Sequence, residues 1–124
     1  MLTFNLKKQW FDKIKSGKKT HEYREVKDFW TDRFVKEWFC VDKKIAPDIF
    51  LNCKIKLLEY LKKGNSICCP YTKIQFMNGM EKEEKRPRLY GKMKSIKIVN
   101  GLQTDLKINK PVYDIEFELI GGAE

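Results

Sequence analysis

The chain has 124 residues, of which 42% are hydrophobic and 35% are charged. This length and composition indicate one folded domain over residues 1–124 and exclude a disordered chain. The formal net charge is +9, but residues 112–124 contain four acids and no Lys or Arg, so the other 111 residues have a net charge of +13. Such a surplus favours a polyanionic partner, nucleic acid before membrane, although a solvated lysine-rich surface explains the charge alone equally well.

The sequence contains no pattern typical of a membrane segment, a metal site or a cofactor site. No apolar run is long enough to cross a bilayer, and the N-terminus lacks a signal-peptide pattern. The four cysteines contain no Cys-x-x-Cys pair, and the single histidine lies far from them. We therefore expect a cytoplasmic protein with reduced thiols, no membrane segment, no metal site and no cofactor.

The first 38 residues predict two strand–helix pairs. Residues 2–6 have the composition of a strand, and apolar side chains at helical spacing follow until Ser16-Gly17 ends the helix. Residues 19–24 predict a second strand. Residues 26–38 predict a helix with a bulky aromatic face, which we interpret as core rather than as a platform for stacking bases.

Residues 39–70 are ambiguous in pattern. Leu51, Ile55, Leu58 and Leu61 have helical spacing, whereas residues 49–57 also alternate like a strand. The length of the pattern and its Lys-Lys-Gly ending at residues 62–64 favour a helix.

The second half of the chain predicts strands. Residues 72–77 alternate and end at Asn78-Gly79, and residues 89–99 form a longer run with a bulge or bend expected between Met93 and Ile96. Residues 113–119 alternate apolar and acidic side chains, which predicts a half-buried strand. Early helices followed by late strands indicate an α+β fold with a small curved sheet or barrel.

Residues 17–24 form a motif with unusual charge, Gly17-x-Lys19-x-x-Glu22-x-Arg24. In a strand, Glu22 and Arg24 point to the same face, and the Gly17 turn lets Lys19 reach either side. Burying one unpaired charge costs several kcal/mol, so three charges that share a cleft would satisfy one another. The surplus positive charge would then serve an anion or the polar edge of a base. The alternative is an exposed strand with incidental ion pairs.

The motif, preceded by Trp10-Phe11-Asp12-x-Ile14, resembles that of the ASCH domain family, which is related to RNA-binding PUA domains. Similar context continues at Phe29-Trp30-x-x-Arg33 and at Phe76-x-Asn78-Gly79. The resemblance covers about residues 1–38 and 71–120. It implies a PUA-like β-barrel with flanking helices, an insertion at residues 39–70, and a cleft that binds RNA or a nucleotide.

Some members of that family deacylate N4-acylated cytidine with a lysine and a threonine of the motif. Lys19 matches the lysine, but Glu22 stands at the threonine's position. A carboxylate is a poor replacement for a hydroxyl nucleophile, so this departure speaks against that activity.

A second candidate surface is the basic segment, residues 82–97, in which seven Lys and Arg residues outnumber two acids around Tyr90. Basic side chains with an interleaved aromatic suit phosphate contact and base stacking, although a solvated hairpin is an equally good reading.

These patterns support three functions. The first is an RNA- or nucleotide-binding module. The second is a hydrolase of a modified nucleoside or RNA, with Lys19 as general base and Glu22 as proton-transfer partner. The third is a non-catalytic protein-interaction domain. The candidate ligand-binding residues are Lys19, Glu22, Arg24, Asn78, Arg86, Arg88 and Tyr90.

Overall fold

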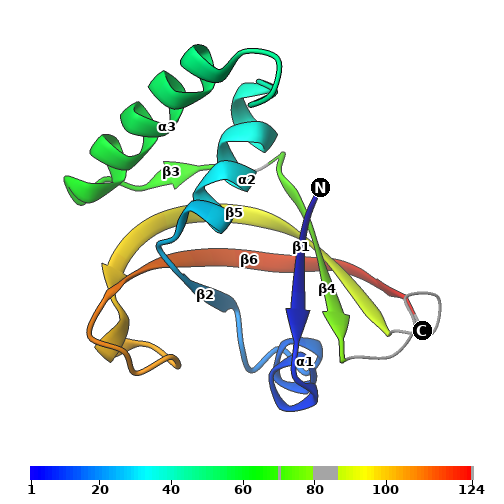
Figure 1. Ribbon diagram of the computed structural model, residues 1–124. Helices are drawn as coiled ribbons and strands as arrows, with labels where there is room; N and C mark the ends of the chain where they lie inside the picture. Colours follow the sequence, from blue (N-terminus) through cyan, green and yellow to red (C-terminus); the bar gives the residue numbers. More distant parts are fainter. Residues whose placement is uncertain (70, 80–86, 124) are drawn as a thin grey trace. The chain divides into compact units, whose positions relative to one another are not determined.

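The structure is a computed structural model that describes residues 1–69, 71–79 and 87–123. This part of the chain contains three α-helices, a 3-10 turn and six strands, which confirms the α+β class (Figure 1). In chain order the elements are β1 Leu2–Leu6, α1 Lys8–Lys15, β2 His21–Glu25, α2 Asp28–Phe39, α3 Pro47–Lys62, β3 Ile67–Cys68, β4 Lys73–Asn78, β5 Arg88–Asn100, η2 Gly101–Gln103 and β6 Pro111–Ala123.

The strands pair in the order β1-β4-β5-β6-β2, and β3 pairs with β5 beside this path. The chain folds into two compact units. The first unit comprises residues 1–22, 68–95 and 115–124, and the second comprises residues 23–67 and 96–114. Strands β2, β3, β5 and β6 each contribute residues to both units.

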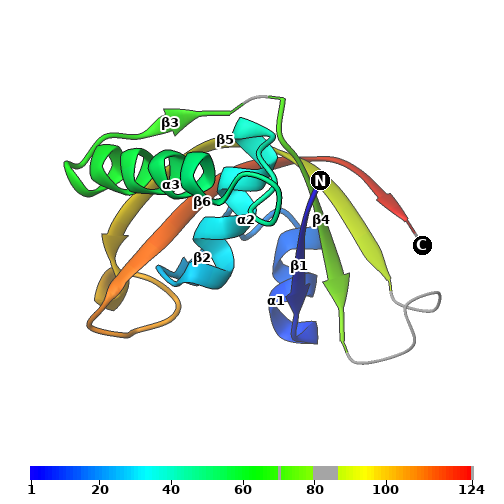
Figure 2. The same cartoon turned by 45° about the horizontal axis from the view of Figure 1, so that its top comes forward.

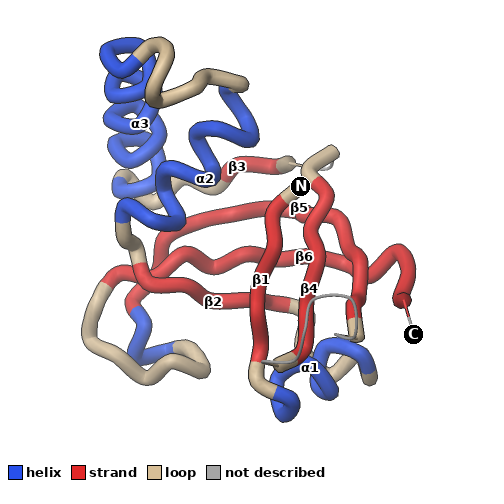
Figure 3. Tube along the Cα trace, turned by 45° about the vertical axis from the view of Figure 1, so that its right-hand side comes forward, coloured by secondary structure: helices blue, strands red, loops and turns tan. Residues whose placement is uncertain are grey.

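The first unit is built on β1, β4 and β5. These strands lie side by side (Figure 3). Strand β1 runs parallel to β4, and β4 runs antiparallel to β5. Phe4 pairs with Phe76 across β1 and β4, with ring centroids 5.9 Å apart, and Phe76 lies 4.7 Å from the ring of Phe117. Helix α1 contacts β1 and β4 and buries Phe11 and Ile14, so its apolar stripe completes this core.

The core of the second unit lies where α2 packs on α3 (Figure 2). Phe34 is fully buried, stacks on Trp38 with centroids 5.1 Å apart, and meets the edge of Tyr113 at 4.9 Å. The hydroxyl of Tyr113 is hydrogen-bonded to that of Thr31. Helix α3 contributes the buried side chains of Phe50, Leu57 and Leu61.

The observed elements test the predictions made for residues 39–99. The ambiguous segment forms a helix, α3, as its length and ending predicted. The segment also adds the short strand β3, which the sequence pattern did not predict. In β5, burial changes phase between Met93 and Ile96, both fully buried, where the sequence predicts a bulge or bend.

The alternation predicted for the last strand is wrong over residues 112–115, which are buried consecutively. Tyr113 contacts Phe34 of α2, while a Cβ added at Gly101 would lie 2.9 Å from Val112. Neighbouring residues of β6 are therefore covered on opposite faces, as in a central strand. Asp114 is consequently buried despite its charge.

The aromatic face of α2 is only partly core. Phe34 is buried, but Phe29 is 57% exposed, which corrects the interpretation of the whole face as core. The ring of Phe29 instead meets the edge of Trp30, with centroids 5.1 Å apart. Phe29 precedes Phe34 by five residues, which places the two side chains on different faces of the helix.

Candidate functional site

A turn between α1 and β2 carries the charged motif. Gly17 adopts a φ of +82°, a left-handed conformation that glycine enters without steric cost. Its N–H donates to the carbonyl of Ile14, and the N–H of Lys19 donates to the carbonyl of Lys13, with N···O distances of 3.0 and 3.1 Å. These bonds fold the chain back on the end of α1 and bring Lys19 to the helix.

Lys19 and Glu22 form a buried ion pair, which we call the Lys19–Glu22 pair. The Nζ of Lys19 lies 3.7 Å from the Oε1 of Glu22, and their side chains are 8% and 7% exposed. The same Nζ is 5.3 Å from the ring centroid of Trp10, and the Nζ of Lys13 is 4.9 Å from that ring. One aromatic ring therefore receives two cations, an arrangement that stabilises positive charge beside the pair.

The separation within the pair determines its chemistry. At 3.7 Å the two groups attract each other, but the distance exceeds the 2.7–2.9 Å of a charge-assisted hydrogen bond. An ammonium offers three donors and a carboxylate about four acceptor sites. The pair thus presents strong donors and strong acceptors side by side, as recognition of a polar ligand edge requires.

Trp10 is a site residue that the sequence interpretation missed. Its position in the helical pattern predicts a core residue, yet it is half-buried and contacts Lys13 and Lys19. The available signal was the spacing of Trp10 and Lys13, three residues apart on one helix face. Nothing in a linear pattern places Lys19 on the same ring, because the Gly17 turn sets that contact.

Arg24 belongs to the second unit, in the C-terminal part of β2. Its Cζ lies 5.0 Å from the ring centroid of Trp30, a cation–π contact with helix α2. Its participation in one cleft with Lys19 and Glu22 stays a prediction.

Asn78, Arg88 and Tyr90 lie on the neighbouring strands β4 and β5 of the first unit. Met77 pairs with Arg88 in the register of these strands, and the N–H of Asn78 donates to the carbonyl of Pro87 at 3.1 Å. Arg88 and Tyr90 are half-buried and alternate with the buried Leu89, so they share the face opposite Leu89. Arg86 lies outside the described residues.

One cation of the basic segment is engaged within the protein. The Nζ of Lys92 lies 2.9 Å from the Oε1 of Glu118, and this contact holds the pKa of Glu118 below its ordinary value. Lys92 is therefore a weaker candidate for phosphate contact than the sequence count suggested. The basic segment as a ligand surface remains a prediction.

Among the described residues, no three His, Cys, Asp or Glu side chains are grouped so that they could hold a metal ion. In the same part of the chain, no helix combines the length and apolar character needed to cross a membrane. Comparison with models of known protein families, with curated proteins and with solved structures found no match.

Proposed function

We propose that this protein is an RNA- or nucleotide-binding module of the ASCH type, with a PUA-like fold, and that the Lys19–Glu22 pair is its recognition element. The observation that carries the proposal is the burial of two opposite charges at the motif, 3.7 Å apart. The resemblance of residues 17–24 to the family motif supports the same assignment.

Stability gives little reason to keep such a pair. Removing two charges from water costs several kcal/mol per ion, and a buried pair is often no more stable than apolar side chains of similar volume. The pair is therefore better explained by ligand recognition than by a need of the fold.

The chemistry of the pair fits a nucleobase edge. Glu22 accepts hydrogen bonds, as from an exocyclic amino group, and Lys19 donates to a carbonyl oxygen or a phosphate. Arg88 and Tyr90, with the rest of the basic segment, would contact backbone phosphates and stack on a base. The net charge of +13 over residues 1–111 supports a polyanionic ligand.

Affinity for single-stranded RNA and for mononucleotides tests the proposal. Lys19→Met should weaken binding by roughly tenfold or more, because a charge-assisted contact is lost. Lys18→Met is the control for the lost charge, because Lys18 is the exposed neighbour in the same turn. Circular dichroism of Lys19→Met before each titration separates a lost contact from a loss of folding, because Lys19 is buried. Equal affinities of the two variants for every probe would refute the site.

A salt series separates base recognition from phosphate contact. Replacing Lys85, Arg86 and Arg88 with alanine should flatten the slope of log affinity against log salt by roughly two, since three phosphate contacts are lost. Glu22→Gln should change the preference among bases and leave this slope nearly unchanged. A Glu22→Gln protein that ranks all ligands like the parent would show that Glu22 is structural.

A further inference from the structure

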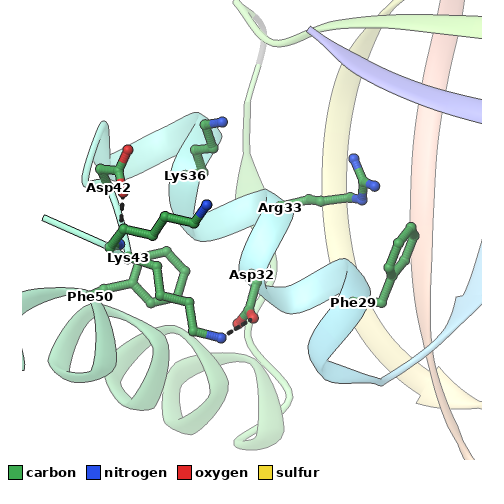
Figure 4. Close-up of a pocket in the computed structure, with 8 residues that line it drawn as sticks. Phe29, Asp32, Arg33, Lys36, Asp42, Lys43 and Phe50 are labelled. Atoms are coloured by element: carbon green, nitrogen blue, oxygen red, sulfur yellow. Dashed lines mark hydrogen bonds and ion pairs between the residues drawn. The ribbon is translucent and has the colours of Figure 1, made fainter. Parts of the chain in front are cut away.

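A cationic groove lies in the second unit, over the exposed stripe of α2 and the loop that follows it (Figure 4). Its volume is about 490 Å³. Phe29, Arg33 and Lys36 line it from α2, at spacings of four and three residues that place them on one helix face. Residues 42–44 of the loop line it as well. We call this feature the α2 groove.

Both carboxylates that line the α2 groove are engaged inside the protein. Asp42 accepts hydrogen bonds from the backbone N–H groups of Lys44 and Ile45, with distances of 2.7 and 3.3 Å. Asp32 is contacted by Lys43 at 3.1 Å and by Lys54 at 2.8 Å. Asp32 is thus paired with lysines other than Lys36 and Lys44, and Asp42 is held by backbone N–H groups.

The electrostatics of Asp32 agree with this engagement. Partial burial alone would raise its pKa, but the ammonium groups of Lys54 and Lys43 hold the pKa below its ordinary value. Lys54 in turn bridges to Asp28 at 2.8 Å, so the acids and lysines of this network are matched.

Three cations of the α2 groove lie outside this network of ion pairs. In the part of the chain that the structure describes, Arg33, Lys36 and Lys44 have no carboxylate partner. The guanidinium of Arg33 is stacked on Phe29, with its Cζ 4.1 Å from the ring centroid. Stacking orients the guanidinium plane and leaves its N–H edge for a bidentate anion.

We propose that the α2 groove binds a phosphate ester, with Arg33 as the bidentate donor and Lys36 and Lys44 as supporting cations. The phosphate is either that of a mononucleotide or a backbone phosphate of a single RNA strand. Phe29, 57% exposed, offers apolar surface to the attached nucleoside. This site goes beyond the proposed function, because it uses other residues in the other unit.

Titration with inorganic pyrophosphate, followed by amide and Arg Nε–H NMR signals, tests the phosphate chemistry. Signals of Arg33, Lys36 and Lys44 should shift on titration. The double variant Arg33→Gln/Lys36→Gln should raise the dissociation constant for pyrophosphate by roughly tenfold or more. Lys56→Gln/Lys62→Gln is the matched control, because it removes two exposed charges of α3 outside the groove. All four side chains are exposed, so both variants should fold like the parent.

Adenosine monophosphate, adenosine and a short single-stranded RNA distinguish the sources of the phosphate. The monophosphate should shift the groove signals and adenosine should not, while tighter binding of the RNA would identify backbone phosphates as the natural ligand. Groove signals unmoved by pyrophosphate, monophosphate and RNA alike would overturn the proposal. Phosphate binding lost in Lys19→Met but kept in the groove variant would also overturn it, whereas the reverse pattern supports the groove whatever the fate of the Lys19–Glu22 pair.

Discussion

Removing one partner of the buried Lys19–Glu22 pair should destabilise the protein strongly, even though the pair as a whole adds little net stability. At 3.7 Å and an effective dielectric constant of about 20, the attraction amounts to about 4.5 kcal/mol. Glu22→Gln leaves the buried ammonium of Lys19 without this carboxylate. We expect a loss of about 3–5 kcal/mol, a large share of the roughly 5–15 kcal/mol that stabilises an ordinary domain.

Urea unfolding followed by circular dichroism measures this loss, and the pair Lys8–Asp12 provides the control. Its atoms are only 2.9 Å apart, but the side chains are 80% and 52% exposed. Lys8→Met should therefore cost about 0.5 kcal/mol or less. A Glu22→Gln protein within about 1 kcal/mol of the parent would refute the reasoning.

The double variant Lys19→Met/Glu22→Leu separates the cost of an unpaired buried charge from the cost of lost packing. It removes both charges and keeps much of the apolar volume, so its free energy of unfolding should lie within roughly 1–2 kcal/mol of that of the parent. A double variant as unstable as Glu22→Gln would assign the cost to packing and not to an unpaired charge.

Three further outcomes are expected. Folding lowers the pKa of Asp32, so the ionised carboxylate stabilises the protein above about pH 4, and this stabilisation is lost as the pH falls through the pKa of the folded state. Lys54→Met should make the free energy of unfolding, measured in urea, fall less between about pH 6 and 2. Burial raises the pKa of Cys69 to about 12, so iodoacetamide at about pH 8 should modify exposed Cys40 and spare Cys69, as peptide mass spectrometry would show. Tyr113→Phe removes one buried hydrogen bond and should lower the unfolding free energy by about 1 kcal/mol in a urea titration.

Local patterns of the sequence predicted the elements well. The first strand has the expected bounds, and the Lys-Lys-Gly ending correctly resolved the segment that contains α3 into a helix. These features depend on neighbours in the chain, such as caps and periodicity, so a linear reading captures them.

Tertiary neighbours decided the features that the sequence did not predict. Asp114 is buried because β6 is covered on both faces, and Phe29 is exposed because the core takes up another face of α2. The parallel pairing of β1 with β4 joins residues 72 positions apart, such as Leu2 and Ile74, and sequence periodicity does not specify that register.

The candidate site divides in the same way. The motif predicted that Lys19, Glu22 and Arg24 share a cleft, and of these Lys19 and Glu22 form an ion pair. The contact of Lys19 with Trp10 depends on how the Gly17 turn closes on α1. The α2 groove was missed because its cations come from α2 and from the following loop, among 26 Lys and Arg residues with no distinguishing spacing.

A crystal structure of the protein soaked with a nucleotide that it binds in solution tests the central claim most directly. We predict ligand density with a base edge or phosphate within about 3.2 Å of the Lys19 Nζ or the Glu22 carboxylate. Density found only elsewhere, for example in the α2 groove, with the Lys19–Glu22 pair unchanged, would contradict the assignment of the pair as the recognition element.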